Sequence, residues 1–268
     1  MDFSLLLTDE EYQKRFKVHP TPYTYILQYR GKRLFYFGVR HSNDPDDSQW
    51  EKLKKFWQDF SKTTIEPRAI FLEGGHVPLI VKNSLQDLII KYGEIGALLY
   101  FTHGTPAEIV SADLPFDKET RQLSNKFEPD LVAYYIFARS AGAWLRTGML
   151  GTFDEVLAKA ANTTSRRIPG APSDITSYGK FHERVFKKPL SDTQKETLIR
   201  ASAPVYHDSV INEIVRASSR LRNEHIVSEV ERYWQSGYSI FLLFGSAHAV
   251  VQEPALRAMI EKKPFVGE

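Results

Sequence analysis

The chain has 268 residues, with 35 lysines and arginines against 33 aspartates and glutamates, a formal net charge of +2 and no cysteine. This balance leaves no excess of positive charge of the kind that non-specific nucleic-acid or acidic-membrane binding uses. The absence of cysteine excludes disulfides, thiolate metal sites and cysteine nucleophiles. We therefore expect a small-molecule or peptide substrate, and neither a nucleic acid nor a membrane as partner.

Two apolar segments of the sequence bear on where in the cell the protein is found. The leucines at positions 5–7 are followed almost at once by acidic residues, which leaves no apolar stretch of signal-peptide length. The longest apolar stretch, residues 131–150, carries Arg139 and Arg146, each of which costs about 3 kcal/mol at the centre of a bilayer. We expect this stretch to be a buried core helix and the protein to be cytoplasmic.

The predicted elements alternate between helices and strands along most of the chain. Capping-box pairs mark four helix starts, at Thr8 with Glu11, Ser48 with Glu51, Thr152 with Glu155, and Ser191 with Gln194. Strands are predicted at 23–29, 33–37, 69–72, 108–112 and 238–244. The first two form a hairpin, and the last four are apolar on both faces, which is typical of strands covered by helices on each side. We therefore predict one α/β domain over residues 1–268, with a mixed, mainly parallel sheet, an antiparallel hairpin and many flanking helices.

Between residues 113 and 237 no strand is predicted. Helices are predicted at 118–127, 129–150, 152–161, 191–200 and 205–235. We interpret residues 117–204, approximately, as a helical insertion. Within it, residues 162–188 are rich in proline, glycine and basic residues, so we predict an irregular segment that serves as a lid or substrate loop, or is a plain surface excursion.

Two predicted strands end in the same way, with a glycine and, three residues later, a histidine. These G-x-x-H segments are Gly38 to His41 and Gly245 to His248. A third strand is followed by Glu73 and, three residues further on, by His76. We expect the glycines to let the backbone turn sharply where the strand ends. Because open α/β sheets bind ligands beyond the carboxyl ends of their strands, these side chains are expected to converge at one edge of the sheet.

Two further residues have positions that favour a site. Glu94 follows Gly93 between two helical stretches, so it is expected at a helix start. Arg222 lies on the apolar side of a long predicted helix, where a guanidinium needs an anionic partner. Glu73, Glu94 or an oxyanion of the substrate would meet this need.

The motifs resemble those of a known family. Gly38 to His41, the glutamates at 73 and 94, Asp113-Leu114-Pro115, Arg222-Asn223 and Gly245 to His248 follow in the order seen in the TraB/PrgY/TIKI superfamily, which also takes in erythromycin-esterase-like and ChaN-like proteins. The resemblance implies a mixed α/β fold in which both histidines, the glutamates and the arginine share a pocket. It implies a metal-dependent protease in TIKI-like members, a hydrolase with a histidine base in erythromycin-esterase-like members, and haem binding in ChaN-like members. TIKI-like proteins are membrane-anchored or exported, so their extracellular substrate is not expected here.

The chemistry of these residues favours a hydrolase of ester or amide bonds. His41, His248 and Glu73 suit a divalent metal ion, manganese, cobalt or zinc, that polarises the scissile carbonyl. Glu94 is then the expected general base, and Arg222 steadies the oxyanion or holds a glutamate in place.

Two alternatives remain open. One is a metal-independent esterase with His41 as the general base. The other is a non-enzymatic protein that binds a ligand such as haem. Clustering of Glu73, Glu94 and Arg222 would favour hydrolysis. His76 and Asp113 are expected as additional pocket residues.

Overall fold

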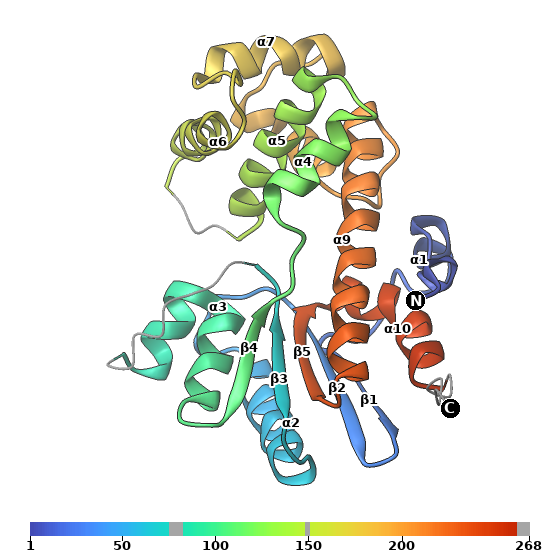
Figure 1. The fold of residues 1–268 in the computed structure, drawn as a ribbon. Helices are drawn as coiled ribbons and strands as arrows, with labels where there is room; N and C mark the ends of the chain where they lie inside the picture. The colour runs from blue at the N-terminus through green and yellow to red at the C-terminus, as the bar shows by residue number, and fades with distance from the viewer. Residues whose placement is uncertain (75–82, 148–150, 262–268) are drawn as a thin grey trace. The chain divides into compact units, whose positions relative to one another are not determined.

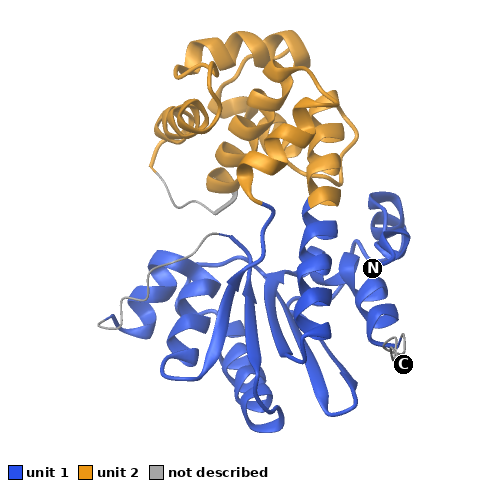
Figure 2. Ribbon diagram, viewed as in Figure 1, with its two compact units in different colours: residues 1–114, 222–268 blue, residues 115–221 orange. Residues whose placement is uncertain are grey.

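A computed structural model describes residues 1–74, 83–147 and 151–261. The chain divides into two compact units, one made of residues 1–114 and 222–268 and the other of residues 115–221 (Figure 2). The first unit contains the sheet, and the second is helical. The predicted helical insertion, residues 117–204, lies inside the second unit. Helix α9 (Val210–Gln235) begins in the second unit and ends in the first.

The sheet of the first unit has five strands in the order β1-β2-β5-β3-β4 (Figure 1). Strands β1 and β2 form the antiparallel hairpin, and the other three pairs are parallel. The strands are β1 (Tyr23–Tyr29), β2 (Lys32–Val39), β3 (Arg68–Leu72), β4 (Ala107–Ser111) and β5 (Ser239–Gly245). The prediction of an α/β fold with a mainly parallel sheet and one antiparallel hairpin is confirmed.

Helices cover both faces of this sheet. Successive strand residues point to opposite faces, so Phe35 and Phe37 pack with α2 (Gln49–Thr63) and α3 (Leu85–Thr102). Leu34 and Tyr36 pack on the other face with α9 and α10 (Ser246–Glu261). All seven residues of β5 are buried. This burial on both faces is why the strands are continuous apolar runs, each large side chain contributing about 1.5–3 kcal/mol.

The helix starts test the capping-box predictions. The boxes at Thr8, before α1 (Asp9–Arg15), and at Thr152 are present. Ser48 makes no side-chain cap hydrogen bond, because its own backbone angles are already helical, although α2 begins at the next residue. Ser191 precedes a short 3₁₀ helix and also makes no cap bond. A further box, which the sequence analysis did not predict, is formed by Ser84 at the start of α3.

The second unit packs around α5. Its elements are α4 (Phe116–Ser124), α5 (Pro129–Thr147), α6 (Phe153–Arg167), α7 (Ile175–Phe186), the 3₁₀ helix η2 (Asp192–Gln194), α8 (Lys195–Ala201) and the first part of α9; a further 3₁₀ helix, η1 (Phe3–Leu5), belongs to the first unit. Helix α5 covers most of the apolar stretch predicted as a core helix, and its Arg139 pairs with the buried carboxylate of Glu119 at 2.9 Å. No helix in the described ranges combines the length and apolar character that a membrane crossing requires.

The prediction that residues 162–188 are irregular was wrong. Helix α6 continues to Arg167, and α7 occupies Ile175–Phe186. Asp174 caps α7 by accepting a hydrogen bond from the Ser177 N–H at 2.8 Å, and the Tyr178 ring stacks on Phe137 with centroids 4.0 Å apart. Proline and glycine therefore mark only the short connection between two helices, and tertiary packing stabilises the helix that follows.

Candidate functional site

Four parallel strands end at one edge of the sheet, and each is followed by a residue of the predicted site. His41 comes two positions after β2, and Glu73 directly follows β3. Asp113 comes two positions after β4, and His248 is the third residue of α10, which follows β5. All of them belong to the first unit. The side chains meet because parallel strands present their carboxyl ends on the same edge.

Glu73 is the centre of this cluster. Its Oε1 accepts a hydrogen bond from Arg222 Nη2 at 3.1 Å, and its Oε2 accepts one from the Gly245 N–H at 2.7 Å. The Nε2 atom of His248 lies 3.6 Å from Oε1, and the Nε2 atom of His41 lies 3.8 Å from Oε2. One carboxylate therefore stands between two imidazoles, each just beyond hydrogen-bond distance.

His41 has a second carboxylate partner. Its Nδ1–H donates to Glu94 Oε1 at 2.6 Å, and 51% of the His41 side chain is exposed against 13% of Glu94. Glu94 is placed by a break in α3 at Gly93, whose φ of 57° and ψ of −134° separate two helical segments. Glu94 thus begins the second segment, as predicted. The pair engages Nδ1 of this half-exposed imidazole, while Nε2 faces Glu73 Oε2 at 3.8 Å, beyond hydrogen-bond distance.

The pKa values of the two histidines are shifted in opposite directions. The hydrogen bond to Glu94 raises the pKa of His41 to about 9, against the effect of burial and with help from Glu73. Burial lowers the pKa of His248 to about 4, although Glu73 opposes this. At neutral pH His41 is therefore an imidazolium and His248 a neutral imidazole.

Glu73 is ionised at neutral pH. Burial acts to raise its pKa, but the surrounding cations and the Gly245 N–H hold the pKa well below its usual value. His248 has the largest lowering effect on the pKa of Glu73 when it is protonated, followed by His41 and Arg222; near pH 7, where His248 is neutral, His41 and Arg222 supply the stabilising charge.

Arg222 joins two carboxylates. Its Nε and Nη2 atoms donate to Asp113 Oδ1 at 2.9 and 2.7 Å, and Nη2 also reaches Glu73. Asp113 is itself held by the Gly74 N–H, which donates to Oδ2 at 2.8 Å. Of the two roles expected for Arg222, these contacts support holding a glutamate in place rather than binding an oxyanion. Asp113 anchors the arginine, and His76 lies outside the described residues.

The glycines of the two G-x-x-H segments provide room for close packing. A Cβ atom on Gly245 would stand 2.8 Å from His41 Nε2 and 3.4 Å from Glu73 Oε2. A Cβ atom on Gly38 would stand 2.8 Å from Ala249 Cβ and 2.8 Å from a backbone oxygen. Neither glycine has a positive φ. The sharp turn expected at these glycines stays a prediction. The structure gives both positions a further reason to be glycine, because a Cβ atom would crowd the groups packed against them.

The donor atoms as they lie do not form a metal site. Zinc, manganese or cobalt needs several donors, each about 2.0–2.2 Å from one point. In the described part of the chain, no three His, Asp or Glu side chains come together in a way that could hold a metal ion. Both oxygens of Glu73 already accept hydrogen bonds, and the guanidinium of Arg222 repels a cation there. The cluster as it stands therefore does not fit a metal ion.

Three further residues belong to the site, and none of them was predicted to have a role in it. A buried row of hydrogen-bonded side chains lies behind His248 and consists of Asn223, Gln252 and Tyr36. Gln252 stands four positions after His248 on one helix, and this spacing was a usable signal. Tyr36 lies in an apolar strand, where no pattern distinguishes it from a core residue.

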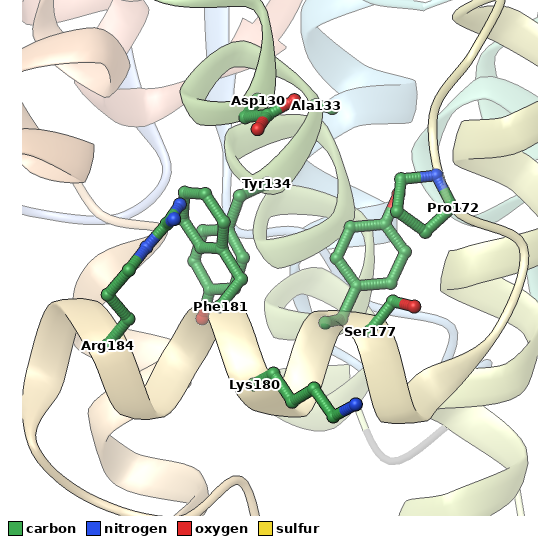
Figure 3. Close-up of a pocket in the computed structure, with 9 residues that line it drawn as sticks. Asp130, Ala133, Tyr134, Pro172, Ser177, Lys180, Phe181 and Arg184 are labelled. Carbon is green, nitrogen blue, oxygen red and sulfur yellow. The ribbon is translucent and has the colours of Figure 1, made fainter.

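The second unit has a separate cavity of about 320 Å³ between α5 and the segment that includes α7 (Figure 3). Phe181 stacks on Tyr134 with ring centroids 4.7 Å apart, and the Arg184 guanidinium lies 4.6 Å from the Phe181 centroid. The described residues that line the cavity include Asp130, Lys180 and Arg184, and none of them is a histidine. We place the candidate active site at the sheet edge, because acid, base and orienting groups meet there.

Comparisons of the chain with known protein families, curated proteins and solved structures found no match.

Proposed function

We propose that this protein is a hydrolase that cleaves ester or amide bonds by acid–base catalysis, with His41 as the proton donor and His248 as the proton acceptor. The observation that supports this most strongly is the pair of imidazoles on the two sides of Glu73, with Nε2 to oxygen distances of 3.8 and 3.6 Å. Their pKa values are displaced in opposite directions, about 9 and about 4, which is the arrangement that assigns an acid and a base.

In the proposed reaction, a water molecule attacks the carbonyl carbon of the substrate and gives a proton to His248 Nε2. His41 Nε2–H donates a proton to the departing alcohol or amine, so the bond to the leaving group breaks without forming a free alkoxide or amide anion. The products are a carboxylic acid and an alcohol or amine. Proton exchange with solvent then restores both imidazoles.

Glu94 and Glu73 support this reaction without forming bonds to the substrate. Glu94 orients His41 through Nδ1 and stabilises its positive charge. Glu73 stabilises whichever imidazole carries the proton, and Arg222 keeps that carboxylate in position. Glu94, which the sequence analysis treats as the general base, is an orienting group in this proposal, since its Oε1 is engaged by His41.

The contacts of Glu73 distinguish between two reactions. One is the metal-dependent reaction implied by TIKI-like proteins, and the other is the histidine-dependent reaction implied by erythromycin-esterase-like proteins. The clustering of Glu73, Glu94 and Arg222 around the histidines favours hydrolysis over haem binding, and the hydrogen bonds to Glu73 favour the histidine-dependent form. A cytoplasmic location and membership of the TraB/PrgY/TIKI superfamily remain part of this proposal.

A panel of chromogenic substrates tests the proposal. Purified protein, dialysed against a chelator and assayed for metal content, is given p-nitrophenyl esters of increasing acyl length and amino-acid p-nitroanilides. We expect hydrolysis of at least one substrate by metal-free protein. Activity that disappears on chelation and returns with manganese, cobalt or zinc would contradict the metal-independent reaction. No hydrolysis of any ester or amide in the panel would contradict the assignment as a hydrolase.

A further inference from the structure

His248 is connected to the core by a row of buried polar side chains. The Tyr36 hydroxyl donates to Gln252 Oε1 at 2.9 Å, and Gln252 Nε2 donates to Asn223 Oδ1 at 2.8 Å. The same Asn223 oxygen lies 2.8 Å from His248 Nδ1. Tyr36 and Gln252 are fully buried, and Asn223 is 3% exposed. The row joins β2, α10 and α9 in the first unit.

The direction of these hydrogen bonds decides which nitrogen of His248 carries the proton. Amide groups can be turned, so the row has two self-consistent directions. In one, Asn223 presents its oxygen and His248 carries the proton on Nδ1. In the other, Asn223 presents its NH₂ group, and His248 carries the proton on Nε2.

Tyr36 favours the first direction. Within the ranges that the structure describes, Gln252 is the hydrogen-bond partner of its hydroxyl. In the second direction this hydroxyl would accept a hydrogen bond from Gln252, and its own proton would be buried without an acceptor. Because the second direction loses this hydrogen bond, the first direction should be more populated than the second by roughly tenfold or more.

We propose that Tyr36, Gln252 and Asn223 are positioning residues that fix His248 in the Nδ1–H tautomer, leaving Nε2 as an acceptor beside Glu73. Nε2 and Glu73 Oε1 are then two acceptors 3.6 Å apart, too far for a direct hydrogen bond. A single donor between them can bridge the gap. In this proposal, the position between Nε2 and Oε1 binds the attacking water or another small O–H or N–H donor. Its assignment to the water rests on the proposed function, whereas the tautomer does not.

The tautomer is measured by NMR on chelator-treated protein with ¹⁵N-labelled histidine, at neutral pH and without substrate. We expect the protonated type of ¹⁵N shift at Nδ1 of His248 and the unprotonated type at Nε2. Tyr36→Phe removes the directing proton and should convert this single tautomer to a mixture. Tyr25→Phe is the matched control, because the Tyr25 ring lies 5.1 Å from that of Tyr36 while its hydroxyl bonds to the Ala249 carbonyl instead.

A proton on Nε2 of His248 in the wild-type protein would overturn the inference, whether or not any variant folds. So would a tautomer that stays unchanged in folded Tyr36→Phe. Because the measurement needs no substrate, a protein that hydrolyses nothing in the panel can still have the expected tautomer. Conversely, hydrolysis by a protein with the opposite tautomer would contradict this inference and the role of His248 Nε2 as the proton acceptor, but not the assignment as a hydrolase.

Discussion

Replacing His41 with alanine should lower kcat/KM by about 10²–10⁴-fold, the usual contribution of a positioned acid–base group. The substitution removes the proton donor of the proposed reaction, while Glu94 and Glu73 stay in place. The free energy of unfolding should fall by about 1–2 kcal/mol, less than for Arg222, because solvent screens the half-exposed His41 although its partner Glu94 is mostly buried. Steady-state kinetics and urea unfolding measure the two effects separately.

His103→Ala is the matched control for this change. His103 is an exposed histidine at the end of α3, in the same unit, and stands outside the candidate site. Its removal should leave kcat/KM unchanged. Full activity in folded His41→Ala would exclude His41 as the acid. Equal losses in both variants would indicate that the assay responds to something other than the site.

Replacing Arg222 with alanine should affect both activity and stability. Its guanidinium lies between Glu73 and Asp113, and only 13% of the side chain is exposed. Its removal leaves two carboxylates without the cation that they share. Breaking a fully buried ion pair lowers the free energy of unfolding by about 3–5 kcal/mol, and we expect a loss near the lower end because these side chains are partly exposed. Arg222→Lys keeps the charge but cannot hold both partners with a planar fork, so it should recover stability more than activity.

Arg232→Ala provides the control on the same helix. Arg232 pairs with Glu229 at the surface, and its loss should change the unfolding midpoint little. Thermal and urea unfolding of the three variants, together with kcat/KM, separate the effect of the positive charge at position 222 from the effect of the planar guanidinium. An Arg222→Ala variant with wild-type stability and activity would contradict the role given to Arg222 and would remove the reason for Glu73 to be ionised and fixed.

The strand-end residues could be predicted from the sequence because the topology decides their position. Once four strands are parallel, His41, Glu73 and His248 must leave the sheet on one edge, although 207 positions separate the two histidines. The inward direction of Arg222 followed from its helical spacing in the same way. These inferences need only the strand pattern and the chain direction.

Other features depend on contacts that no local pattern records. The pairing of His41 with Glu94 depends on where the break at Gly93 places the second half of α3. The link from Tyr36 to His248 crosses three elements of the first unit. The helix at Ile175–Phe186 was missed because its stability comes from packing on α5 rather than from its own sequence.

The pH dependence of kcat/KM tests the acid–base assignment most directly. The pKa of His41 is raised to about 9, so its proton is present below that pH and is lost as the pH rises through it. We expect kcat/KM of the wild-type protein to fall as the pH rises through about 9, and His41→Gln to lack this decline in its residual activity. A wild-type rate that instead increases through about pH 9, in step with the deprotonation of His41, would make His41 a base and contradict the account.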